Sequence, residues 1–185
     1  RSEGFDVVWT REPGGTPIAE AIRGILLDPN YKEMLPATEA LLYAASRTQH
    51  TLEKIKPALE EGKIVICDRY IGSSIAYQGW ARNLGIQAIE SINDFGIKGF
   101  RPDVEFFIDM KPEVGLERAG KIKAQDRLEQ EGLKFHEKVH SGFTVDAAIK
   151  PYVITIDGHG TIDEITNQIY EIIKERLFQK QHSFC

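Results

Sequence analysis

The sequence is poor in cysteine and has no long hydrophobic run, and each deficit excludes a class of protein. Only Cys67 and Cys185 occur among 185 residues, too few for the disulfide framework of a small secreted domain. No apolar run approaches the roughly 20 residues that cross a bilayer, and no signal peptide is visible. We therefore expect a cytoplasmic protein without a membrane segment.

Positive charge is also scarce. The chain has 23 Lys and Arg against 28 Asp and Glu, a formal net charge of −5. This balance argues against a nucleic-acid partner, which needs a basic stripe, but allows a small anionic ligand held by a few arginines. Hydrophobic residues make up 42% and charged residues 28%, as in ordinary globular proteins. The length predicts a single domain over residues 1–185.

Short apolar runs alternate with helical patterns along the whole chain. Strands are predicted at 5–9, 64–67, 104–109 and 152–156. Helices are predicted at 17–27, 38–60, 73–77, 86–96, 112–120, 133–139 and 162–177. This alternation predicts an α/β fold with a parallel sheet covered by helices on both faces. In such sheets ligands bind beyond the C-terminal ends of the strands.

The segment TREPGGT, residues 10–16, follows the first predicted strand. Its glycines let the backbone approach a ligand closely, although a plain strand-to-helix turn would also use Pro-Gly-Gly. The charged pair Arg11 and Glu12 is not needed to make a turn, which favours a functional interpretation. Arg23, in the next helix, is either an exposed arginine or part of the same site.

Asp68 and Arg69 directly follow the apolar residues IVIC of the second strand. This is the form taken by the magnesium-associated aspartate of P-loop nucleotide enzymes, and Mg²⁺ prefers carboxylate and water oxygens. Arg69 could clamp a phosphate in bidentate fashion. The alternative interpretation is a salt-bridged pair at a strand end.

Two helical segments carry side chains suited to a nucleotide. Tyr43 and Arg47 lie four residues apart, hence on one helical face, where a ring can stack on a base and a guanidinium can donate to its carbonyl. Ser74, Tyr77 and Gln78 suit the edge of a sugar or base. The alternatives are a core tyrosine with an exposed arginine, and the polar side of an amphipathic helix.

A polar stretch near residues 120–132 includes Lys121, Lys123 and Arg127. A run of charges is usually a solvated face. The functional interpretation is a lid that brings cations over a transferring phosphoryl group and excludes water.

In their order and spacing these segments resemble the bacterial-type thymidylate kinases of the P-loop nucleoside monophosphate kinase superfamily. TREPGGT, LLYAASRTQH, DRYIGSSIAYQG and DRLEQEGLKFHEKV carry the resemblance over nearly the whole chain. It implies a P-loop kinase fold and phosphoryl transfer from ATP to dTMP, giving dTDP and ADP for dTTP synthesis. It also implies Mg²⁺ as a cofactor and a homodimer. A kinase for another nucleoside monophosphate and a catalytically inactive nucleotide-binding protein remain as alternatives.

The resemblance also implies residue roles. The residues that it implies are catalytic are Glu12, Asp68, Arg69 and Arg127, and Asp68 is expected to bind the metal. Its substrate-binding residues are Arg11, Arg23, Tyr43, Arg47, Ser74, Tyr77 and Gln78. Among them, Arg23 contacts the dTMP phosphate, Tyr43 stacks on thymine and Arg47 faces a thymine carbonyl. Tyr77 crowds the sugar 2′ position and so favours deoxyribose, and Lys121 and Lys123 accompany Arg127 in the lid.

One family motif does not occur in these residues, because no G-x-x-x-x-G-K-[ST] is present. In the family this P-loop follows a first strand and precedes the strand predicted here at 5–9. The resemblance implies that the first strand, P-loop and first helix, about 25–30 residues together, precede Arg1, and that a chain truly without them is inactive. Two segments, near 121–125 and 143–150, also look short for the family.

Overall fold

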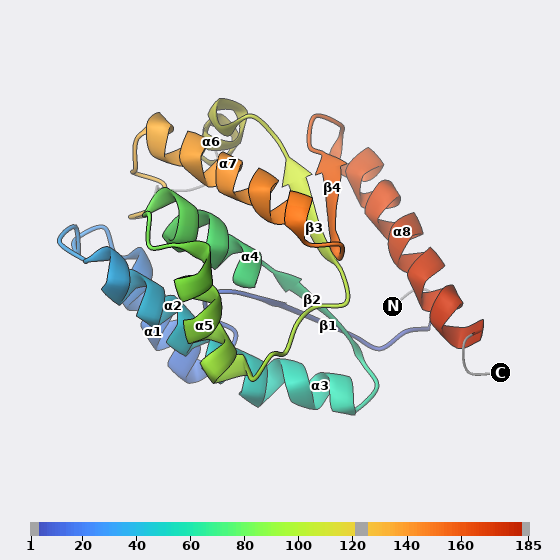
Figure 1. Cartoon of the computed structure of the whole chain (residues 1–185). Coiled ribbons are helices and arrows are strands. Elements are labelled where there is room, and N and C mark those ends of the chain that lie inside the picture. The colour runs from blue at the N-terminus through green and yellow to red at the C-terminus, as the bar shows by residue number, and fades with distance from the viewer. Residues whose placement is uncertain (1–3, 121–125, 183–185) are drawn as a thin grey trace.

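The computed structural model describes residues 4–120 and 126–182, and strands alternate with helices throughout these ranges (Figure 1). No helix within them is long and apolar enough to span a membrane. In chain order the elements are β1 (Val7–Arg11), α1 (Pro17–Leu27), α2 (Pro36–His50), the π-helical η1 (Thr51–Ile55), α3 (Lys56–Glu60), β2 (Ile64–Asp68), α4 (Ile71–Ser74), the π-helical η2 (Ile75–Ala81), α5 (Ile86–Ile97), β3 (Glu105–Asp109), α6 (Pro112–Gly120), α7 (Leu133–Ile149), β4 (Val153–Asp157) and α8 (Ile162–His182).

All four strands are paired in parallel, which confirms the predicted α/β class. They form two separate pairs, β1 with β2 and β3 with β4, where the sequence suggested one sheet. No described strand joins β2 to β3 through hydrogen bonds. In the first pair, Arg11 lies opposite Asp68. The predicted segments 5–9 and 64–67 therefore end too early, because an apolar run does not reveal the polar residues that complete a ladder.

Pro57 determines the shape of the long helical segment predicted at 38–60. The segment is helical from Pro36 to Glu60, but η1 interrupts the α-helical pattern just before the proline. Proline has no N–H to bond the carbonyl four residues earlier. The turn widens instead, and the Lys56 N–H bonds the Thr51 carbonyl five residues earlier.

The later helices differ from prediction mainly in length. Helix α7, predicted at 133–139, runs without a break to Ile149, so the segment 143–150 is almost entirely helical. A capping box opens α8. The Glu164 carboxylate accepts a hydrogen bond from the Thr161 N–H at 2.8 Å, and the Glu164 N–H donates to the Thr161 hydroxyl at 3.3 Å.

A cluster of buried isoleucines joins the helices that surround the first strand pair. It includes Ile55 of η1, Ile71 of α4, Ile75 of η2, and Ile89 and Ile97 of α5. Helix α7 crosses η2 closely at Gly142, which has no side chain. A Cβ there would meet the backbone of Ala76 at 2.9 Å. This packing holds α2, η2 and α7 around the C-terminal ends of β1 and β2 (Figure 1).

Candidate functional site

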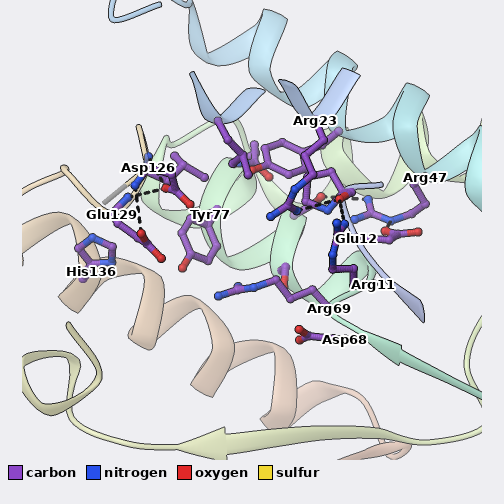
Figure 2. Close-up of a pocket in the computed structure, with 17 residues that line it drawn as sticks. Arg11, Glu12, Arg23, Arg47, Asp68, Arg69, Tyr77, Asp126, Glu129 and His136 are labelled. Carbon is purple, nitrogen blue, oxygen red and sulfur yellow. Dashed lines mark hydrogen bonds and ion pairs between the residues drawn. The ribbon is translucent and has the colours of Figure 1, made fainter. Parts of the chain in front are cut away.

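A cleft of about 280 Å³ opens beyond the C-terminal ends of β1 and β2 (Figure 2), close to the lower limit of small-molecule sites, roughly 300 Å³. The structure brings together all the site residues predicted from sequence except Arg127. Those that line the cleft are Arg11, Glu12, Arg23, Tyr43, Arg47, Asp68, Arg69, Ser74, Tyr77 and Gln78. They come from distant segments of the chain, so only the fold brings them together.

The turn after β1 gathers two arginines on one backbone carbonyl. Arg23 donates to the Pro13 carbonyl at 2.8 Å and Arg11 donates to the same oxygen at 3.3 Å. The turn requires glycine, because Gly15 has a φ of +92° and a Cβ there would lie 2.5 Å from the His50 ring. Arg11 also pairs with Glu20 at 3.0 Å, and Figure 2 shows Arg11 and Arg23 converging from opposite sides.

Arg47 is the most heavily bonded side chain of the cleft, although it is only 2% exposed. Its Nε donates to the Glu12 carboxylate at 2.7 Å, and its Nη1 donates to the Ser74 hydroxyl at 2.9 Å and the Asn93 carbonyl at 2.6 Å. Its Nη2 donates to the Tyr70 backbone carbonyl at 3.0 Å. A guanidinium has five N–H donors. Four have partners, so one N–H on Nη2 is left without a partner in the part of the chain that the structure describes.

Asn93 reaches Arg47 because helices α2 and α5 pack closely. A Cβ at Gly96, one turn after Asn93, would collide with the Thr48 hydroxyl. The Asn93 amide nitrogen donates to the Ile89 carbonyl at 2.7 Å, which leaves its oxygen for Arg47. Sequence reasoning missed Asn93, because nothing in a single amphipathic helix distinguishes a buried asparagine from an exposed one.

Glu12 and His50 complete this buried network. The His50 Nδ1 lies 3.0 Å from the second Glu12 oxygen, and its Nε2 lies 2.7 Å from the Thr10 hydroxyl. Glu12, His50 and Cys67 have ligand atoms within 4.8 Å of one another, as in a metal site. The Arg47 guanidinium 2.7 Å from Glu12 already neutralises that carboxylate. The cluster therefore suits an ion-pair network better than a cation.

Asp68 and Arg69, at the end of β2, do not take part in this buried network. Both side chains are exposed, and neither forms an ion pair with any described residue, so the salt-bridged pair considered from the sequence is not formed. Arg69 has a φ of +64°, a conformation that costs a non-glycine residue about 1 kcal/mol or more. Its guanidinium lies 5.6 Å from the centre of the Tyr77 ring. The Tyr77 hydroxyl raises the pKa of Arg69 further above its usual range.

The Gln78 amide is held by a buried glutamate that sequence reasoning did not single out. Its nitrogen donates to Glu39 at 2.9 Å, and Glu39 is 0% exposed. Glu39 also pairs with Arg82 at 3.3 Å and with Arg127 at 2.7 Å. Near this group, burial raises the pKa of the Tyr43 hydroxyl, which keeps the ring neutral at physiological pH.

Arg127 occupies a different place from the one expected of a catalytic lid cation. It is 7% exposed and donates to the Leu26 backbone carbonyl at 2.9 Å, while its neighbours Asp126, Leu128 and Glu129 line the cleft. Lys121 and Lys123, the other cations expected in the lid, lie outside the described residues. The lid near 120–132 stays a prediction.

His136 of α7 also lines the cleft, opposite Arg47, beside Asp126 and Glu129 (Figure 2). Its Nε2 is buried without a hydrogen-bond partner among the described residues. Burial lowers the pKa of the imidazole, so the neutral form is favoured. The helical pattern around Leu133 did not reveal this position, because a lone histidine on a helix is most often structural.

Comparison with known proteins adds an independent finding. The family model described as thymidylate kinase matches residues 1–169 of the chain. The thymidylate kinase of Geobacillus sp. (strain WCH70) is 51% identical over 168 residues, which cover 89% of this chain and 80% of that protein. The thymidylate kinase of Lactobacillus helveticus is 50% identical over 171 residues, covering 91% and 81%. That of Halalkalibacterium halodurans is 47% identical over 182 residues, covering 96% and 86%.

Proposed function

The chain belongs to the thymidylate kinase family, and on this premise we propose the roles of the residues that line the cleft. The reaction is phosphoryl transfer from ATP to dTMP, which yields dTDP and ADP in the synthesis of dTTP. The observation that carries the assignment of residues is the convergence of Tyr43, Arg47 and Gln78 with Arg23 and Arg69 on one cleft. Base-reading and phosphate-binding groups are thereby available to a single nucleotide.

We assign the recognition of thymine to Tyr43, Arg47, Ser74 and Gln78, called here the base set. The Tyr43 ring supplies a face for stacking. Arg47 has one N–H left after its four hydrogen bonds, enough for one base carbonyl. Glu12 orients this guanidinium, so we assign it a positioning role beside the catalytic role that the resemblance implies.

The nucleotide phosphate is assigned to Arg11, Arg23 and Arg69, which with Asp68 form the phosphate set. The Pro13 carbonyl holds Arg11 and Arg23 together and neutralises neither, because a carbonyl has no net charge. Arg11 is in addition paired with Glu20, so Arg23 is the more available of the two cations. Two guanidiniums there and a third at Arg69 suit a phosphate dianion. Tyr77, beneath Arg69, is assigned to the sugar, where its ring would exclude a 2′ hydroxyl.

Asp68 fits the magnesium role better than any other carboxylate of the cleft. Its side chain is exposed at the strand end and forms no hydrogen bond or ion pair with the described residues. Glu12, by contrast, is occupied by Arg47 and His50. Asp68 would hold Mg²⁺, which would supply positive charge beside the phosphates.

Transfer between two phosphates requires alignment and charge neutralisation rather than a covalent enzyme intermediate. Arg69 would stabilise the negative charge on the acceptor side, and Asp68 would act as a ligand, not a nucleophile. Arg127 remains a candidate for the catalytic cation only if its contacts with Glu39 and Leu26 open during the cycle. Lys121 and Lys123 are the other candidates.

We also propose a homodimer in the cytoplasm, as a single domain without nucleic-acid or membrane partners. Large apolar side chains exposed on two packed helices support the dimer, since Leu41 of α2 is 58% exposed and Phe95 of α5 is 89% exposed. The low cysteine content supports a reducing compartment.

The test is a comparison of phosphoryl acceptors. With ATP as donor, we expect dTMP and dUMP to be phosphorylated, while dGMP and AMP give little or no product. Equal rates for all four would contradict the role of the base set. Binding of nucleotides without turnover would support the inactive nucleotide-binding alternative.

A further inference from the structure

Glu39 controls which end of the Gln78 amide is available to the cleft. The carboxylate lies between the guanidiniums of Arg82 and Arg127, and an ion-paired carboxylate has no proton to donate. Gln78 must therefore turn its amide nitrogen toward Glu39, and this nitrogen donates to the Glu39 carboxylate at 2.9 Å. The Gln78 amide oxygen accepts no hydrogen bond from the described residues, so it is available as an acceptor for a ligand in the cleft.

The neighbouring base-reading group has the opposite polarity. Arg47 retains one N–H donor on Nη2, while its Nη1 donates to the hydroxyl of Ser74 at 2.9 Å. Ser74 lies four residues, about one helical turn, before Gln78. The wall formed by η2 and α2 thus offers one acceptor and one donor to the edge of a base.

Thymine and uracil carry an N3–H donor beside the C4 carbonyl acceptor, which is the complementary pattern. Cytosine carries an N3 acceptor beside an amino donor at C4. Cytosine would therefore set its N3 lone pair against the Gln78 oxygen, and an unmet buried polar group is penalised more than a lost contact.

We propose that Glu39 is a positioning residue that determines specificity: it fixes the polarity of the Gln78 amide and so selects N3–H pyrimidines over cytosine. This rests on the proposed function, because it assumes that Gln78 meets the base. Glu39 itself does not line the cleft. A purely structural role, in which Glu39 only anchors Arg82 and Arg127, is the competing explanation.

The decisive variant is Glu39→Gln. The substituted amide keeps its oxygen toward the two guanidiniums and turns its nitrogen toward Gln78. Gln78 then accepts with its oxygen and offers its nitrogen to the base. Dissociation constants for dTMP and dCMP, measured by calorimetry without ATP, should show the dCMP-to-dTMP ratio falling by about tenfold or more.

Arg82→Met is the matched control. It removes one ion pair from Glu39 and one from Glu131 but leaves a Glu39 carboxylate that can only accept. The ratio should therefore stay as in the wild type even if both affinities fall. An unchanged ratio in Glu39→Gln, or an equal fall in Arg82→Met, would overturn the assignment of Glu39. Wild-type protein that does not bind dTMP would overturn the proposed function as well.

A ligand probe keeps the proposal testable if Glu39→Gln does not fold. The 5′-monophosphate of 5-methyl-2′-deoxyisocytidine keeps the C4 carbonyl and the methyl group of dTMP but has an N3 acceptor. The wild-type protein should bind it at least about tenfold more weakly than dTMP. Equal binding would show that the Gln78 amide is not fixed, and would overturn the proposal.

Discussion

The base set and the phosphate set lie in the same cleft but are built in opposite ways. Arg47 is 2% exposed and has four hydrogen-bond partners. Arg69 is exposed and forms no ion pair with the described residues, and Arg23 donates to a backbone carbonyl rather than to a carboxylate among them. The protein holds the base set in place before any ligand arrives, whereas Arg23 and Arg69 of the phosphate set keep their charges available.

The difference follows from what each set has to recognise. A base keeps its hydrogen-bonding pattern throughout the reaction, so rigid and buried partners can discriminate it without rearrangement. A phosphoryl group changes its charge distribution during transfer, and free cations can respond to it together with a metal ion. Substitutions in the base set should therefore affect folding and affinity, whereas those in the phosphate set should affect turnover.

The largest effect is expected from Arg47→Met. Glu12, which is also buried, would lose its guanidinium partner, and breaking a buried ion pair costs about 3–5 kcal/mol. We expect the unfolding free energy in urea to fall by that amount and dTMP affinity to fall by about 1–3 kcal/mol. Arg23→Met is the control, with a stability change of about 1 kcal/mol or less. A stable Arg47→Met would contradict the comparison.

Arg69→Ala should have the converse effect. We expect kcat to fall by about 10²–10³-fold, the scale for losing one electrostatic donor at a reaction centre. Stability should barely change, because the side chain is exposed and forms no ion pair with the described residues. Stopped-flow turnover and thermal unfolding measure the two effects, and Arg69→Lys should recover part of the rate. Normal turnover in Arg69→Ala would remove this residue from the reaction centre.

A smaller effect is expected from Asn93→Ala, which removes one acceptor from Arg47 without removing the guanidinium. The KM for dTMP should rise about fivefold, equivalent to about 1 kcal/mol, with little change in kcat. Asn93→Asp keeps the acceptor oxygen and should restore the wild-type KM. Equal losses in both variants would indicate a packing defect rather than a role in orienting Arg47.

The smallest effect is expected outside both sets. Burial raises the pKa of the Glu105 carboxyl on β3, and the nearby Asp146 raises it further. The folded state therefore binds this proton more tightly than the unfolded chain does. Its contribution to stability is complete below the ordinary value of 4.5 and is lost as the pH rises through the raised value.

Glu105→Gln removes this titration, so the variant should gain stability relative to the wild type as the pH rises above the ordinary value of 4.5. Denaturation in urea across this range measures the gain. The values of kcat/KM should not change, because Glu105 does not line the cleft. A parallel pH dependence in both proteins would contradict the assigned burial effect.

Sequence patterns located the helices and strands well where local chemistry decides them. The helix Pro17–Leu27 was predicted with its observed bounds, because Pro17 at its first position and the apolar periodicity that follows are local features. The helical segment at 38–60 was also predicted, but the π-helical η1 that it contains just before Pro57 was not. Local pattern alone cannot choose between a kink and a widened turn.

The chain alone therefore determined the α/β class, the family and the residue types of the cleft, since short motifs with fixed spacing carry that information. Only the tertiary structure decided that Glu39, Asn93 and His50 orient the cleft residues, and that Arg127 is buried against Glu39. These contacts join residues 38 to 88 positions apart in the sequence. No periodicity within one helix encodes which polar side chain will meet which partner when the helices pack.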